Sequence, residues 1–139
     1  MSEMGTIIEY SEDVAEAEAP KALPASDYPV TITGAELGVS QNSGKKRVAV
    51  TFTVAPEDYP ADYEDAESFP DGKTVMHYVG AEDNLAARFR MRKFCEAIGV
   101  PASKNIDINS WVGREAVAAL EPDEFEGIER ERCKSVKKA

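Results

Sequence analysis

The stretch RVAVTFTV, residues 47–54, decides the fold. Every second residue in it is apolar, namely Val48, Val50, Phe52 and Val54. A period of two places these side chains on one face of an extended chain, and β-branched and aromatic residues favour strands. The sequence therefore predicts a strand over 47–54 with one buried face.

A partner strand precedes it. Residues 28–37 alternate apolar and polar positions apart from a slip at Gly34, which indicates a β-bulge. The intervening Gln41-Asn42-Ser43-Gly44 is typical of a turn, because Asn and Gly accept positive φ at little cost. We expect 28–37 and 47–54 to form a hairpin.

The rest of the chain predicts three more strands and a helix. A strand over 73–79 is followed by a helix that Asp83 or Asn84 caps and that ends at Gly99. Two further strands are expected over 115–120 and 128–136, joined by a turn over 122–127. This β-β-β-α-β-β order predicts a mainly β, OB-like barrel with one helix. An open α+β sheet is the alternative.

Two acidic segments set the domain organisation. The net charge is −10, yet residues 1–20 carry six acidic residues and residues 56–71 carry seven, with no Lys or Arg in either segment. We expect an extended N-terminal arm over 1–26 and one barrel domain over 27–139, with a long acidic loop over 55–72 that contains three prolines.

The residue inventory argues against an enzyme and against a cofactor. The single histidine, His77, alternates with Val75 and Val79 and is expected in a strand rather than in a catalytic dyad. One His and two distant cysteines, Cys95 and Cys133, do not supply four zinc ligands. We therefore expect no catalytic residues, no cofactor and no metal, and two reduced thiols.

Membrane association and export are also not expected. No stretch reaches the roughly 20 apolar residues of a membrane span. The acidic N-terminus lacks the pattern of a signal peptide. We expect the protein to act in the compartment where it is made.

Basic residues form the candidate nucleic-acid site. They cluster at the hairpin tip and along the predicted helix, as Lys45, Lys46 and Arg47, and Arg88, Arg90, Arg92 and Lys93. Single strands bind to a positive groove with aromatic platforms. Among the aromatic candidates Phe52, Tyr78 and Trp111, we expect Phe52 and Trp111 to be core residues.

The arm and the loop supply candidate partner-binding residues. These are the arm's few apolar anchors, Ile7, Ile8 and Tyr10, and Asp58, Tyr59 and Tyr63 of the loop. Long loops inside compact domains are often functional. The acidic arm could alternatively cover the basic surface as a mimic of phosphate.

Short motifs carry a family resemblance. Leu23-Pro24, Tyr28-x-Val30-x-Ile32 and Ser43-Gly44-Lys45 precede the 48–54 strand, Trp111-Val112-Gly113-Arg114 precedes a later one, and Phe125-Glu126-Gly127 lies at the last turn. Over residues 23–136 this pattern resembles small bacteriophage OB-like proteins, a poorly characterised family suspected of binding single-stranded DNA. The acidic arm and the acidic loop depart from that family.

The resemblance implies one of two phage roles. We expect a non-enzymatic structural or assembly protein, a capsid cement or decoration protein or another small virion subunit. It would dock on other virion proteins, the major capsid protein first, or on copies of itself, and would be found in the virion and, before assembly, in the host cytoplasm. The alternative is a replication protein that binds single-stranded DNA.

Overall fold

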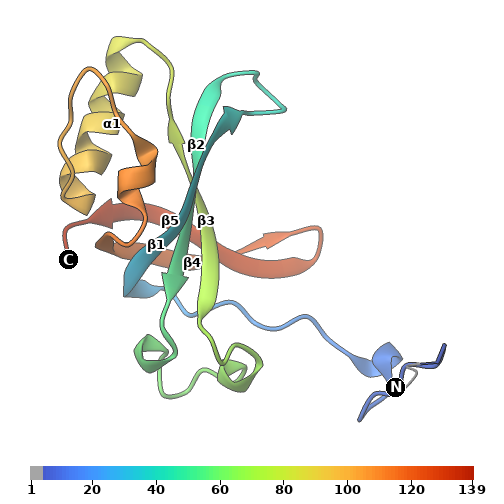
Figure 1. Ribbon diagram of the computed structural model, residues 1–139. Coiled ribbons are helices and arrows are strands. Elements are labelled where there is room, and N and C mark those ends of the chain that lie inside the picture. The colour runs from blue at the N-terminus through green and yellow to red at the C-terminus, as the bar shows by residue number, and fades with distance from the viewer. Residues whose placement is uncertain (1–4) are drawn as a thin grey trace.

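Five antiparallel strands form one sheet, with a single α-helix packed against it (Figure 1). The computed structural model describes residues 5–139. The sheet order is β3-β2-β1-β4-β5. The elements are β1 (Ser26–Val39), β2 (Lys46–Val54), β3 (Lys73–Gly80), α1 (Leu85–Ile98), β4 (Glu115–Phe125) and β5 (Ile128–Lys137). The mainly β class and the predicted element order are confirmed.

The β1–β2 hairpin forms as the alternation predicts. The four apolar residues of β2 are all buried, and Phe52 is fully enclosed. The register shifts between Ile32 and Gly34, which confirms the bulge. Gly44 turns the hairpin with a positive φ of 69°. Local pattern and turn chemistry are enough to specify this unit.

Helix α1 closes one end of the sheet. The Asn84 side chain accepts a hydrogen bond from the Ala87 amide at 2.9 Å, and Gly99 ends the helix in the left-handed conformation. The buried stripe packs onto the core through Phe94, whose ring centroid lies 5.1 Å from that of Trp111. Trp111 is itself fully buried, as expected of a core residue.

The sheet is open, so the expectation of a closed barrel is wrong and the open α+β alternative holds. β3 and β5 are the two edge strands, although Cα atoms of the two approach within 8 Å. Side chains rather than a backbone ladder join them. Lys73 at the start of β3 makes an ion pair of 2.5 Å with Glu131 of β5, and both side chains are largely buried.

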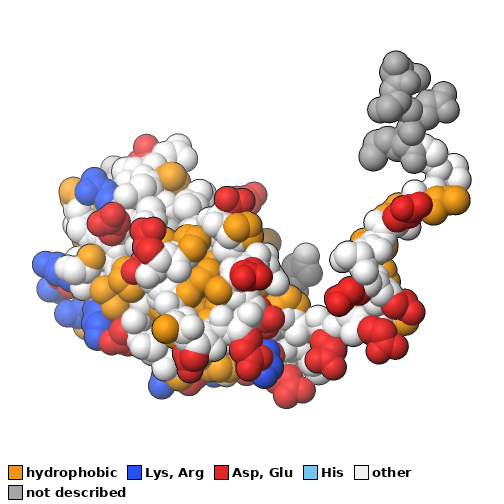
Figure 2. All heavy atoms as spheres, turned by 90° about the horizontal axis from the view of Figure 1, so that it is seen from below, with side chains coloured by type: hydrophobic (Ala, Val, Ile, Leu, Met, Phe, Trp, Pro, Cys, Tyr) orange, Lys and Arg blue, Asp and Glu red, His pale blue; other side chains and the backbone are white. Residues whose placement is uncertain are grey.

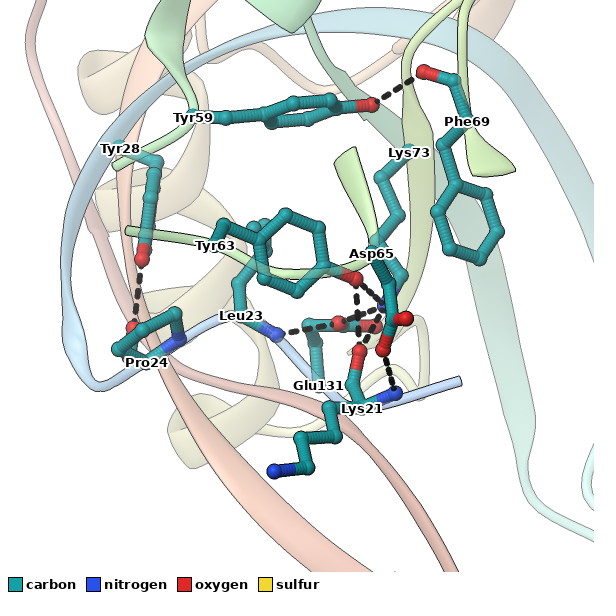
Figure 3. Close-up of polar contacts among 10 residues, drawn as sticks. All are labelled: Lys21, Leu23, Pro24, Tyr28, Tyr59, Tyr63, Asp65, Phe69, Lys73 and Glu131. Atoms are coloured by element: carbon teal, nitrogen blue, oxygen red, sulfur yellow. Dashed lines mark hydrogen bonds and ion pairs between the residues drawn. The ribbon is translucent and has the colours of Figure 1, made fainter. Parts of the chain in front are cut away.

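Around this pair, four separate segments meet (Figure 3). The Lys73 ammonium also donates to the Tyr63 hydroxyl at 2.9 Å and to the Lys21 carbonyl at 3.0 Å. Glu131 accepts from the Leu23 amide at 2.7 Å. Burial disfavours the charged form of Lys73, but Glu131 and Tyr63 outweigh that effect and raise its pKa. The cluster fastens the base of the arm and the acidic loop to both sheet edges.

The last hairpin is longer than predicted. β4 continues to Phe125 instead of ending at residue 120, and Pro122 lies within it opposite Glu131. The turn is the two-residue Glu126-Gly127, with φ values of 53° and 80°. Two positive φ values match the twist of a tight hairpin, so the strands pair up to the turn. The prediction placed a turn at Pro122 because proline usually interrupts a ladder.

The arm extends away from the domain (Figures 1 and 2). Residues 5–21 are exposed, with a short 3-10 turn at Val14–Glu16, and the chain first becomes buried at Ala22 and Leu23. The acidic loop contains 3-10 turns at Pro56–Asp58 and Ala66–Ser68. Within the described residues, no helix has the length and apolar character needed to cross a membrane.

Candidate nucleic-acid interface

A groove follows the open side of the sheet between β3 and β5. It has a volume of about 620 Å³ and is lined by residues 74–78 of β3 and by residues of β4 and β5. A second hollow of about 270 Å³ continues it toward α1 and shares His77 and Tyr78 with it. We call the two together the seam groove.

Tyr78 lines both hollows of this groove and carries an exposed aromatic ring. Because Val75 and Val79 point into the core, the intervening β3 positions Met76 and Tyr78 face outward, and Tyr78 is 48% exposed. The guanidinium of Arg47, on the neighbouring strand β2, lies 3.9 Å from the Tyr78 ring centroid. A cation–π contact at an exposed site contributes about 0.5–1 kcal/mol.

Strand β5 adds cations that the sequence analysis did not single out. Arg130 and Arg132 alternate along β5, so they share one face and line the groove. Lys134 occupies a bulge, because Ala119 pairs with Ser135 and Leu120 with Cys133, and the residue lines the second hollow. The sequence did contain a signal for these two arginines, because acidic and basic residues alternate over 129–132 and so place both arginines on one face of a strand.

The helix cations divide between two surfaces. Arg90 and Lys93 line the seam groove beside Tyr78. Arg88 and Arg92 instead line a different groove, together with Lys46. The predicted basic set is therefore not one site. Its members at the seam groove are Arg90 and Lys93. Arg47 contacts the Tyr78 ring but, like the exposed Lys45, lines none of these grooves.

The electrostatics of the seam groove favour an anionic ligand. Asp123 and Glu131 also line it, but Glu131 is occupied by Lys73. Arg132 and Lys134 lie 4.0 and 3.8 Å from Glu121, distances at which exposed ion pairs contribute little. Among the described residues, Arg90 and Arg130 have no ion-pair partner within 4.0 Å. Cations of this kind can donate hydrogen bonds to the phosphate oxygens of a nucleic acid.

His77 lies at the floor of the groove as a strand residue. Its ring stacks between Phe52 and Phe94, with centroid distances of 5.8 and 6.0 Å. Burial lowers its pKa, so the imidazole is neutral at pH 7. Within residues 5–139, no cluster of three or more His, Cys, Asp or Glu residues could hold a metal.

Two of the three loop residues predicted to bind partners, Tyr59 and Tyr63, make hydrogen bonds within the fold (Figure 3). Tyr63 is buried and its hydroxyl donates to the Lys21 carbonyl at 2.6 Å. Tyr59 is half-buried and donates to the Phe69 carbonyl at 2.8 Å. Asp58 is half-buried at the end of a 3-10 turn. The three arm residues, Ile7, Ile8 and Tyr10, are exposed.

Comparison with known proteins does not assign a family. No protein-family model matches the sequence, and a search of curated proteins finds no matching relative. Function is therefore inferred from the geometry of the described residues.

Proposed function

We propose that the protein binds single-stranded DNA along the seam groove. The observation that carries this proposal is the half-exposed Tyr78 ring, which contacts the Arg47 guanidinium, while Arg90, Lys93 and Lys134 line the same hollow as Tyr78. An exposed ring in a region lined by cations matches the two requirements of single-strand binding, a stacking platform and a positive track for the backbone.

The shape of the site supports a single strand rather than a duplex. Only an unpaired base offers its face to an aromatic ring. The platform lies on the β2–β3 side of the sheet and beside the β4–β5 hairpin. Thr51 and Thr53, on the same outward face of β2 as Arg47, lie opposite Met76 and Thr74 and continue the polar surface along the strand.

Fluorescence anisotropy with labelled oligo(dT) tests the proposal. At low salt the full chain should bind, and log Kd should rise linearly with log salt concentration as counterions are released. Tyr78→Ala should weaken binding by about tenfold, since stacking contributes about 1–3 kcal/mol per base. Arg130→Ala should reduce the salt slope by about one. Oligo(rU) in parallel tests preference for DNA over RNA.

Phe89→Ala is the matched control for Tyr78→Ala. Phe89 is 52% exposed and lies beneath Lys93, yet it lines neither hollow of the seam groove. Its removal should leave the affinity unchanged. Equal affinities for Tyr78→Ala and Phe89→Ala, or no binding of the full chain to oligo(dT) at low salt, would exclude the seam groove as a DNA site.

A capsid role is the second candidate. The observation that favours it is the acidic arm, which carries exposed Ile7, Ile8 and Tyr10 and extends away from the domain (Figure 2). Such an arm suits a decoration protein that reaches a neighbouring subunit, with its charge steering the encounter. Mass spectrometry of purified phage particles tests this role. Absence of the protein from the particles would exclude a capsid role.

A further inference from the structure

A second groove lies on the other side of α1 from the seam groove. It has a volume of about 790 Å³ and is formed by the far end of the β1–β2 hairpin, by α1 and by residues 102–108. We call it the helix groove. Its apolar lining includes Leu37, which is 60% exposed, and the half-buried Met91, Ile106 and Ile108. Its rim carries Lys46, Arg88, Arg92 and Lys104.

The two carboxylates that line this groove, those of Glu82 and Asp83, already have partners within the domain. Asp83 pairs with Arg88 at 2.5 Å, and the Glu82 carboxylate accepts the Lys46 amide at 2.9 Å. Within the described residues, Lys46 and Lys104 have no ion-pair partner within 4.0 Å. The groove thus has an apolar lining, and the charged residues around it are mostly basic. A segment that fits it must combine apolar side chains with acidic ones.

The arm of this same chain has that combination. Over residues 7–18 it carries five acidic residues and no Lys or Arg. Ile7 and Ile8 are 79% and 75% exposed, so their apolar surface is uncovered. Figure 2 shows the acidic side chains along the arm and Lys and Arg side chains gathered on the opposite side of the domain. Arm and groove are complementary in both charge and polarity.

Geometry favours a second copy as the source of the arm. The arm leaves the domain next to Ser26, whereas the helix groove lies beyond Leu37, at the opposite end of β1. Ser26 and Leu37 are 11 residues apart on β1, which corresponds to about 36 Å at roughly 3.3 Å per residue. The arm runs away from the domain rather than along β1 toward the groove (Figure 1). An arm from a neighbouring molecule can enter the groove without folding back over its own domain.

We propose that the arm of one molecule, through Ile7 and Ile8, docks in the helix groove of a second copy. The contact is heterologous, because the arm of one subunit meets the groove of the next, and it therefore builds open chains of subunits, or a ring where the rotation between subunits closes. It does not depend on DNA binding. If the seam groove also binds single-stranded DNA, the contact gives cooperative coating of the strand.

Sedimentation velocity of the full chain without DNA tests the contact. We expect the sedimentation coefficient to rise with protein concentration and association to weaken with salt. Leu37→Ser should weaken association by about tenfold, as expected for one buried leucine. Val39→Ser is the matched control, because Val39 is equally exposed on the same strand and does not line the helix groove.

Complementation separates this arrangement from other self-association. The double variant Ile7→Ser/Ile8→Ser lacks a competent arm and should not associate alone, and Leu37→Ser has a weakened groove and should associate alone about tenfold more weakly than the native chain. Mixed together they should form a one-to-one complex with the affinity of the native contact and grow no further. A native chain that stays monomeric at all concentrations, or a mixture that does not associate, overturns the proposal. Docking of the arm on its own domain would appear as the monomeric outcome.

Discussion

The ammonium of Lys73 and the carboxylate of Glu131 lie 2.5 Å apart and connect the two edge strands of an open sheet. The two residues are 58 positions apart and belong to β3 and β5. The pair also anchors the base of the arm through the Lys21 carbonyl and the Leu23 amide. A single buried ion pair therefore closes one end of the seam groove and fixes where the arm begins.

Removal of one member of this pair should be costly. Glu131→Gln leaves the Lys73 charge buried without a carboxylate, and we expect a loss of about 3 kcal/mol in the free energy of unfolding. Urea denaturation followed by circular dichroism measures it.

The double variant Lys73→Met/Glu131→Leu is the control. It removes both charges and fills similar volume, so it should recover most of the loss, within about 1–2 kcal/mol of the native protein. A Glu131→Gln variant as stable as the native chain would show that the pair is not a structural link.

The cap of α1 gives a smaller effect. Asn84→Ala removes the side-chain acceptor of the Ala87 amide and should lower the free energy of unfolding by about 1 kcal/mol. The adjacent Asp83→Ala removes only an exposed ion pair with Arg88 and should change it by less than about 0.5 kcal/mol. Thermal denaturation of the two variants distinguishes the cap from a general effect of charge.

His77 should make stability depend on pH in a defined direction. Burial lowers its pKa in the folded protein, so below pH 6.5 the unfolded chain binds the proton more readily. Stability is then complete above pH 6.5 and falls as the pH drops toward the pKa of the folded state. Denaturation at pH 7.5 and 5.5 should show a loss that His77→Gln lacks. An identical pH dependence in both proteins would contradict this assignment.

Cys133 should react slowly with alkylating reagents. Burial raises its pKa to about 11, and a backbone hydrogen bond at Ser135 offsets part of that effect. At pH 8.5 its thiolate population is then roughly 100-fold lower than that of an ordinary thiol. Mass spectrometry after iodoacetamide treatment should find little modification of the native protein and rapid modification in urea. Rapid alkylation of the native Cys133 would contradict the burial of this thiol.

Local features were predicted well because their causes lie close together in the sequence. Alternation over residues 47–54, the bulge at Gly34 and the helix ending at Gly99 all depend on neighbouring residues. The candidate site was predicted in part. Tyr78 was named as a candidate aromatic platform and Arg90 as a candidate basic residue. Arg130 and Arg132 were not named, because they join the groove only through the position of β5 beside β3, which the sequence does not reveal.

The sequence by itself determined the order of strands and helix, the buried face of each and the acidic character of the arm and loop. Only the tertiary structure decided whether the sheet closes, which cations meet Tyr78 and that Tyr63 lies inside the fold. The reason is physical. Periodicity and turn residues act over a few positions, whereas β3 and β5 are brought together by the accumulated twist of the sheet and by one ion pair between residues distant in the chain.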